Sequence, residues 1–280
     1  MSMNIGADIA SYVKQIEQEA SKVARNNNIM AALVRSFNDL SGTALRARSE
    51  YGTASFNQIS DSDDLTSQTF TPSVQNTLTP YEFGAQFFIT DTRLRNDPFN
   101  MASEARDELG MAFAQKVELD LLATFSSFTG GTVTSAGNLT WGMLLAAYSR
   151  LRMVANRSDA VAVLSPYQWH SLGTAIAPAA GVSQTNAPAL QDALLRNYWV
   201  GNYGGLQIYV TSNLSAGTVT AGVFVPDAAA LDVRVPFTIE PERDASRRGY
   251  ELNATGTYAA GVWRPRFGVQ LISASTAPTA

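Results

Sequence analysis

A strand followed by a long helix is the clearest pattern of hydrophobic and polar positions in the chain. Apolar residues alternate with polar or small ones between Leu78 and Thr90. The apolar positions are Tyr81, Phe83, Ala85, Phe87 and Ile89. This period of two predicts a strand with one buried face. Asp97-Pro98 then predicts a helix start, because aspartate caps a first turn and proline fits the first helical position.

An apolar residue recurs at every fourth position of the segment that follows. These residues are Met101, Ala105, Leu109, Phe113, Val117, Leu121 and Phe125. Such a row predicts a helix with one apolar face over about seven turns. At about 1.5 Å per residue the helix would be roughly 40 Å long. A rod of that length beneath a sheet suits a structural scaffold better than a catalytic cleft.

Two shorter apolar stripes precede this unit and predict two helices of an N-terminal arm. The first contains Ile9, Val13, Ile16, Ala20 and Val23, and the second contains Ile29, Leu33, Phe37 and Leu40. Asn26-Asn27-Asn28 separates them, and Ser41-Gly42 predicts the end of the arm. Each helix is too short to be stable alone in water, so each needs a partner surface.

The chain from Ala44 to Thr79 is polar and has no helical period. We predict a strand near Ala54–Ile59, an acidic tip at residues 60–64 and a return through Phe70-Thr71-Pro72. A connection this long is uncommon in compact domains. Both flanks have strand character, which favours a long two-stranded finger over a loose loop. An isolated hairpin is only marginally stable, so the finger is expected to lie on another surface.

The remaining chain alternates helices and strands and then ends in strands. After a turn-rich break at Thr129–Gly137, we predict a mixed lobe from Leu139 to Pro226. Its predicted elements are helix 139–156 capped by Thr140, strand 160–164, helix 165–176 opened by Ser165-Pro166, a helix ending near Asn197, and strands 206–211 and 219–225, which would pair. The tail predicts strands at 233–240, 250–258 and 267–272.

Composition narrows the classes of function. Charged residues make up 16% of the 280 residues, the net charge is −4, and there is no cysteine. Disulfides and thiolate metal sites are therefore excluded, and nothing global favours nucleic acid. No leader-like or membrane-spanning apolar run occurs, which predicts a soluble protein made in a cytoplasm. The three lysines against seventeen arginines fit either a surface rich in interfaces or a codon bias.

Candidate catalytic and metal-ligating residues give weak signals. His170 is the single histidine, and no Gly-x-Ser-x-Gly elbow marks a nucleophile. A helix-surface or interface histidine is the better interpretation. The acidic run at 61–64 lacks the glycine and terminal glutamate of a calcium loop, which favours a solvated or arginine-paired tip. Glu240, Glu242 and Asp244 fit the polar face of a strand. We predict no catalytic residue, no cofactor and no metal.

Opposite charges are segregated along the projecting parts. Residues 20–48 carry five basic residues against Asp39 alone: Lys22, Arg25, Arg35, Arg46 and Arg48. Residues 49–79 carry four acids and no base: Glu50, Asp61, Asp63 and Asp64. A second basic cluster contains Arg243, Arg247 and Arg248. Such segregation favours complementary docking between subunits, and scattered solvated charge of little energetic value is the alternative.

The order of these parts resembles the major capsid proteins of tailed double-stranded DNA bacteriophages, which have the Hong Kong 97 capsid fold. The resemblance covers about Ala44 to Ile272. It rests on Ile89-Thr90-Asp91, Asp97-Pro98 with its long helix, and the segments 163–169, 204–213 and 239–244. It implies an α+β fold with an N-terminal arm (1–43), an E-loop (44–90), a P-domain spine helix (91–138), an A-domain (139–230), and P-domain strands with a C-terminal tail (231–280).

The resemblance also implies an assembly. Pentamers and hexamers would close into an icosahedral shell around packaged double-stranded DNA, with a portal protein and no membrane, and would form in the host cytoplasm. No lysine lies between Arg48 and Thr90, so we expect no lysine cross-link in the E-loop and non-covalent burial, aided by a separate cement protein. The short arm implies a separate scaffolding protein. An encapsulin-like nanocompartment and, from another class, an α/β hydrolytic enzyme remain the alternatives.

Two site hypotheses follow. The acids Asp61, Asp63 and Asp64 at the tip of the E-loop are expected to approach a basic cluster on a neighbouring P-domain. That cluster contains Arg243, Arg247 and Arg248. The basic arm, with Lys22, Arg25 and Arg35, is expected near the inner wall, where it would face DNA or a scaffold without sequence preference.

Overall fold

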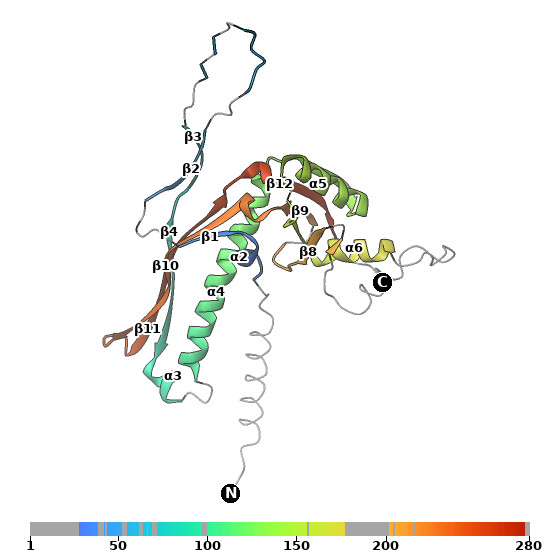
Figure 1. The fold of residues 1–280 in the computed structure, drawn as a ribbon. Helices are drawn as coiled ribbons and strands as arrows, with labels where there is room; N and C mark the ends of the chain where they lie inside the picture. Colours follow the sequence, from blue (N-terminus) through green and yellow to red (C-terminus); the bar gives the residue numbers. More distant parts are fainter. Residues whose placement is uncertain are drawn as a thin grey trace.

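A computed structural model of the chain describes residues 28–38, 42, 44–51, 55–61, 64–65, 67–68, 72–96, 100–155, 157–176, 202–203, 205–214 and 217–277. Figure 1 shows three parts in this structure: a hairpin that projects from the body, a long sheet backed by helix α4, and a lobe around a second sheet. The N-terminal helix predicted for residues 9–23 lies outside the described residues.

The long sheet has four strands in the order β1-β10-β11-β4. They are β1 (Arg35–Phe37), β10 (Ala229–Asp244), β11 (Gly249–Val262) and β4 (Tyr81–Thr90). β10 and β11 form a long antiparallel hairpin, which confirms the two tail strands predicted there and extends both. The strand predicted at β4 is also confirmed. Its buried face is incomplete, because Ile89 is buried while Tyr81 is 63% exposed.

The prediction of a second helix in the arm is wrong beyond Leu33. Helix α2 covers Met30–Leu33, and the chain then becomes strand β1. β1 runs parallel to β10, with Phe37 opposite Asp232. Tertiary pairing therefore overrides the helical spacing of Ile29, Leu33 and Phe37, because a place at the edge of a sheet satisfies the backbone of this short segment.

Helix α4 (Met101–Ala123) confirms the predicted long helix, and a 3₁₀ turn, η1 (Thr124–Ser127), extends it. Its 23 residues span about 35 Å. Leu109, Val117, Leu121 and Phe125 of the apolar row are buried. The predicted Asp97-Pro98 start lies outside the described residues, and Asn100 takes the N-cap position. An unpredicted short helix, α3 (Asp91–Arg95), follows β4 and is capped by the Thr90 side chain.

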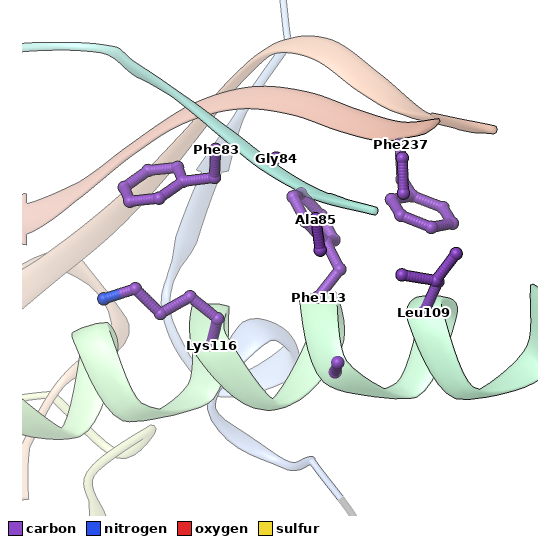
Figure 2. Close-up of a pocket in the computed structure, with 9 residues that line it drawn as sticks. Phe83, Gly84, Ala85, Leu109, Phe113, Lys116 and Phe237 are labelled. Carbon is purple, nitrogen blue, oxygen red and sulfur yellow. The ribbon is translucent and has the colours of Figure 1, made fainter. Parts of the chain in front are cut away.

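Aromatic side chains pack between α4 and the long sheet. The ring of Phe113 lies 5.0 Å from that of Phe237 and 5.5 Å from that of Tyr258, between centroids. The Tyr258 hydroxyl donates to Asp120 Oδ2 of α4 at 2.7 Å. Figure 2 shows Phe83 and Phe237 on the strands facing Phe113 and Leu109 of α4. These residues line an apolar cavity of about 250 Å³. The helix is thus held at several points, and its packing stays incomplete between them.

The lobe contains a six-stranded sheet with the order β5-β12-β9-β6-β8-β7. Its strands are β5 (Thr132–Asn138), β12 (Gly268–Ser275), β9 (Gly217–Phe224), β6 (Val161–Leu164), β8 (Leu206–Val210) and β7 (Asn202–Tyr203). The predicted pairing of the strands at 206–211 and 219–225 is wrong, because β6 lies between β8 and β9. The turn-rich break at Thr129–Gly137 is also wrong in part, because β5 pairs in parallel with β12.

The two helices predicted at 139–156 and 165–176 are confirmed, and both pack against this sheet. Helix α5 (Trp141–Val154) begins after Thr140, whose side chain accepts from the Met143 amide at 3.3 Å. Helix α6 (Pro166–Ile176) begins after Ser165. The Ser165 hydroxyl accepts from the Gln168 amide, and the Gln168 side chain accepts from the Ser165 amide, which makes a reciprocal cap. The helix predicted to end near Asn197 lies outside the described residues.

Short 3₁₀ turns link the lobe to the long sheet. η3 (Pro226–Ala228) leads from β9 into β10, and η4 (Pro265–Phe267) leads from β11 into β12. The backbone joins the two turns: the amides of Trp263 and Arg264 both donate to the Ala228 carbonyl. The chain crosses between the two sheets at these two turns and once more through α4, which leads from β4 to β5. An apolar core that includes Phe224 and Tyr258 packs across both sheets.

The projecting hairpin consists of β2 (Arg46–Tyr51) and β3 (Pro72–Leu78), paired antiparallel from Arg46 opposite Leu78 to Tyr51 opposite Pro72. The strand predicted near Ala54–Ile59 is wrong, because residues 55–60 form no ladder. The Gln68 side chain instead bonds the backbone of Ser55, accepting from its amide at 2.9 Å and donating to its carbonyl at 2.6 Å. Side-chain hydrogen bonds thus hold this part of the finger together.

A glycine substitution on β11 tests the packing of α4, and a glycine substitution on α6 is its control. A Cβ at Gly256 of β11 would lie 2.7 Å from Phe113 Cε2, whereas a Cβ at Gly173 of α6 would meet nothing within 4 Å. Gly256→Ala is expected to lower the free energy of unfolding by about 1–3 kcal/mol through overpacking. Gly173→Ala is expected to raise it by about 0.5–1 kcal/mol, because alanine is the better helix former. Urea unfolding curves measure both changes, and an unchanged midpoint for Gly256→Ala would contradict this account.

Candidate functional site

The root of the hairpin is held by a buried ionic network, which we call the root network: Arg46, Asp232 and Arg234. Arg46 Nε donates to Asp232 Oδ2 at 2.8 Å. Arg234 donates to the same oxygen from Nε at 3.0 Å and from Nη2 at 2.8 Å. The side chains of Asp232 and Arg234 are fully buried. Two guanidinium groups therefore share one carboxylate away from water, where breaking a pair is costly.

The root network joins three separate segments of the chain. Arg234 Nη2 also donates to the Ala44 carbonyl at 2.8 Å, and the Arg46 guanidinium lies 4.2 Å from the Phe37 ring centroid on β1. Asp232 lies opposite Phe37 in the β1–β10 ladder. The arm, the hairpin and the long sheet thus meet at this one carboxylate.

The other strand of the hairpin is attached through Trp263 and Leu78. The Trp263 carbonyl accepts from Arg48 Nη1 at 3.2 Å and from Asn76 Nδ2 at 3.0 Å. Leu78 is buried with Ala230 and Ala259 of the long sheet. Both strands of the hairpin are therefore anchored, so the root sets the direction in which the finger projects.

Beyond the root the hairpin exposes apolar side chains. Phe56 is 102% exposed and Leu65 is 80% exposed, and Ile59 is also exposed. Single exposed apolar residues are ordinary, whereas contiguous exposed patches are typical of interaction sites. Asp61 and Asp64 of the predicted acidic tip are exposed on the same hairpin, and Asp63 lies outside the described residues.

The predicted arginines lie together at the far end of the β10–β11 hairpin, in what we call the sheet tip. Arg243 donates to both carboxylate oxygens of Asp91, at 2.5 and 2.9 Å, and lies 4.8 Å from the Tyr250 ring centroid. The hydrogen bond from Arg243 lowers the pKa of Asp91, and the same bond raises the pKa of Arg243. Sequence reasoning did not predict this pairing with Asp91.

Two more groups shape the sheet tip. Arg247 Nη1 lies 3.0 Å from Glu251 Oε1, and its guanidinium lies 4.2 Å from the Phe88 ring centroid. The carboxylate of Asp244 accepts from the Ser246 hydroxyl and from the Ser246 and Arg247 amides, which lowers the pKa of Asp244. Arg248 has a positive φ of 50°, and its carbonyl accepts from the Asp91 amide at 2.9 Å. Contacts within the chain therefore hold the side chains of Arg243 and Arg247 in place, and the turn fixes the backbone at Arg248.

The acidic hairpin and the sheet tip lie at opposite ends of the long sheet. The hairpin root packs against Ala230, Asp232 and Trp263, whereas the sheet tip is the turn after Asp244. Figure 1 shows the hairpin β2–β3 leading away from the body in the direction opposite to α3. The two predicted clusters are therefore not brought together within one chain.

Arg35, from the predicted basic arm, lies in an ion-pair cluster. Its Nη1 is 3.2 Å from Asp227 Oδ1, and Arg157 Nη1 is 2.7 Å from the other oxygen of Asp227. Arg157 also pairs with Asp159 at 2.6 Å. The Arg35 side chain keeps about half of its surface exposed. Lys22 and Arg25 lie outside the described residues.

Sequence reasoning missed Glu118, a buried carboxylate on α4. Glu118 Oε2 accepts from the Met30 amide at 2.8 Å, where the arm enters the body, and Oε1 has no hydrogen-bond partner among the described residues. Burial raises the pKa of Glu118, opposed by the bonds from the Met30 and Ile29 amides. Glu118 lies between Val117 and Leu119, and the adjoining residues also alternate polar and apolar side chains. Nothing in the sequence therefore marks this glutamate as buried.

Metal and membrane sites find no support in the described residues. No group of three or more histidine, cysteine, aspartate or glutamate side chains among them could hold a metal ion. None of the helices described is long and apolar enough to cross a membrane. His170 is exposed on α6, as expected for a histidine on the surface of a helix.

Comparison with known proteins identifies relatives over most of the chain. A family model described as "Phage capsid protein" matches residues 75–271. No curated protein matches the chain. Solved structures match along nearly its whole length, all at low identity, so these matches speak for the fold.

Three of the matching structures come from different phages. The structure from Mycobacterium phage Che8 is 18% identical, with a TM-score of 0.70 over 88% of this chain and 91% of that chain. The structure from Gordonia phage Cozz is 14% identical, with a TM-score of 0.69 over 88% of its own length and 90% of this chain. The capsid of Cyanophage P-SCSP1u is 13% identical, with a TM-score of 0.68 over 90% of both chains.

The root network can be tested by removing its shared charge. Asp232→Asn is expected to lower the free energy of unfolding by about 3–5 kcal/mol, because two guanidinium groups lose their buried counter-charge. Asp159→Asn breaks an exposed pair and is expected to cost no more than about 1 kcal/mol. Hydrogen exchange should rise in residues 44–51 and 72–78 of Asp232→Asn alone. Unchanged exchange there would mean that the network does not anchor the hairpin.

Glu118 predicts a pH dependence of stability. Its folded pKa is raised above the unfolded value of about 4.5, so the folded state holds its proton more tightly and stability falls as pH rises from 4.5 through the folded pKa. Glu118→Gln keeps an oxygen that can accept the Met30 amide and has no charge to bury. The variant is expected to lose this component of the slope when thermal unfolding is followed from pH 4 to 8. Parallel curves for the two proteins would contradict the assignment.

Proposed function

The chain belongs to the phage capsid protein family, and from this premise we propose that its copies assemble as pentamers and hexamers into an icosahedral shell around double-stranded DNA. The family makes it a structural shell protein of the virion rather than an enzyme, with the Hong Kong 97 capsid fold. The observation that carries the proposal is the projecting hairpin, which is anchored rigidly at its root and exposes Phe56 and Leu65. In an isolated chain these two side chains remain in contact with water, whereas a neighbouring copy could cover them.

The proposed parts keep their expected roles. Residues 1–43 act as the arm, 44–90 as the E-loop, 91–138 as the spine of the P-domain, 139–230 as the A-domain, and 231–280 as the P-domain strands and tail. β12 lies within this last range, and its place beside β9 means that the tail also completes the sheet of the A-domain. The lobe and the long sheet are therefore expected to move as a connected pair.

We further propose that the tip of the E-loop docks on the sheet tip of a neighbouring copy. Asp61, Asp63 and Asp64 would face Arg243, Arg247 and Arg248. The separation of the two clusters within one chain supports an intermolecular contact. Asp91 and Glu251 hold Arg243 and Arg247 in place, which reduces the entropy lost on docking. The side chain of Arg248 has no ion pair among the described residues and would supply the unbalanced charge.

Other partners follow from the same proposal. A portal protein, a separate scaffolding protein and a cement protein would complete the particle, and assembly would take place in the host cytoplasm. The basic arm, with Lys22, Arg25 and Arg35, would contact DNA or the scaffold at the inner wall. Arg35 retains exposed surface despite its pair with Asp227, so it can contribute charge to such a contact.

Electron microscopy of the purified full chain, with nuclease treatment and nucleic-acid quantification, tests the shell. We expect closed icosahedral particles, with nuclease-protected DNA in those recovered from infected cells. DNA-free shells filled with a single enzyme would instead indicate a nanocompartment. A small discrete oligomer under every assembly condition would contradict the proposed function.

Charge reversal tests the docking contact separately. Replacing Asp61, Asp63 and Asp64 by arginine is expected to abolish particles in the same microscopy assay, because it opposes like charges at the contact. Replacing Arg243, Arg247 and Arg248 by glutamate in that variant is expected to restore them. Particles of normal shape from the first variant would rule out the contact while leaving the shell itself in place. Failure of the combined variant to recover, with both proteins folded by circular dichroism, would also count against it.

A further inference from the structure

A cavity of about 440 Å³ lies beside the hairpin root, and no part of the assembly proposal uses it. It forms where the two hairpin strands approach the end of α5 and the turn η4. Arg48 and Asn76 line it from the hairpin, Val154 from α5, and Arg264 and Arg266 from the segment around η4. We call this cavity the arginine notch. It is separate from the root network, whose arginines are Arg46 and Arg234.

The arginine notch carries positive charge that its own lining does not balance. Its described lining residues include three arginines and no aspartate or glutamate. Arg264 and Arg266 form no ion pair with any described residue, and Arg264 Nε is buried without a hydrogen-bond acceptor there. The carboxyl end of α5 supplies at most about half a negative charge. Arg264 and Arg266 therefore leave positive charge in the notch that no carboxylate of its described lining offsets.

Neighbouring contacts hold the guanidinium groups in place. Arg48 donates to the Trp263 carbonyl at 3.2 Å, and the Arg264 guanidinium lies 5.2 Å from the Phe267 ring centroid. Burial lowers the pKa of Arg48, and the charge of Arg264 lowers it further. Two cations are thus held close enough to repel each other. A fold keeps such an arrangement at a cost that a bound anion would remove.

We propose that the arginine notch binds a phosphate group. Guanidinium groups form paired hydrogen bonds with phosphate oxygens, and a buried N–H donor without an acceptor gains most from such a ligand. Inorganic phosphate carries more charge and more acceptor oxygens than a single carboxylate, so it can serve several arginines at once. The group would come either from free inorganic phosphate or from the backbone of DNA, and both sources present non-bridging phosphate oxygens that accept from guanidinium groups.

Isothermal titration of the full chain with inorganic phosphate in a chloride buffer tests the site. We expect saturable binding of one phosphate per chain. Arg264→Gln and Arg266→Gln should each weaken it about tenfold or more, because each removes a charge-assisted hydrogen bond. Arg106→Gln, on an exposed position of α4, is the matched control and should leave the affinity unchanged. Arg266 is itself exposed, so its substitution keeps the test valid if Arg264→Gln fails to fold.

A second titration with a short DNA duplex identifies the source. If the duplex binds, loses affinity in Arg266→Gln but not in Arg106→Gln, and is displaced by phosphate, the ligand is the DNA backbone. If the notch variants change phosphate binding alone, the ligand is the free anion. Absence of saturable phosphate binding, or equal loss in Arg106→Gln, would overturn the proposal. So would notch variants that block particle formation while they bind phosphate normally, because the notch would then serve a protein partner.

Discussion

Asp232 is the point on which the arrangement of the arm, the hairpin and the long sheet depends. One of its oxygens accepts from both Arg46 and Arg234, and the side chains of Asp232 and Arg234 are fully buried. Its other oxygen, Oδ1, and Arg234 Nη1 have no hydrogen-bond partner among the described residues. A buried network of this kind contributes less to net stability than apolar packing would, since desolvation offsets much of the attraction. The network instead fixes the direction in which the hairpin projects, because a displaced hairpin would leave a buried charge unpaired.

The rest of the protomer divides its tasks around that anchor. α4 and the long sheet form a stiff body through the Phe113, Phe237 and Tyr258 contacts, while the hairpin presents apolar and acidic side chains far from it. The sheet tip presents arginines that are already fixed by carboxylates of their own chain. Rigid elements with exposed contact groups at their ends suit a chain that repeats in many copies. Such contacts need little reorganisation when they form.

Regular local signals predicted most of the fold. The apolar row of α4, the Thr140 and Ser165 caps and the long tail strands all appear in the structure as expected. The predictions fail where pairing with a distant segment determines the local structure. β1 forms in place of a helix because it pairs with β10, and β5 forms because it pairs with β12. The charge clusters of the candidate site could be predicted from the sequence, but the residues that pair with them could not. Asp91 is distant from Arg243 in the sequence, and nothing in the sequence showed that Glu251 would pair with Arg247. Asp232 and Arg234 left only a trace, which is two charges at alternate positions of an apolar strand.

The position of β12 has a consequence for synthesis. β12 lies between β5 and β9, so it separates two parts of the six-stranded sheet that are made much earlier. Until residues 268–275 leave the ribosome, β5 has no neighbouring strand and β9 keeps an open edge. A nascent chain therefore lacks a finished lobe even after the hairpin and α4 have been made. A protomer that has not been synthesised as far as β12 therefore cannot present a complete surface to its neighbours. Synthesis of this strand thus sets the earliest point at which the protomer can assemble.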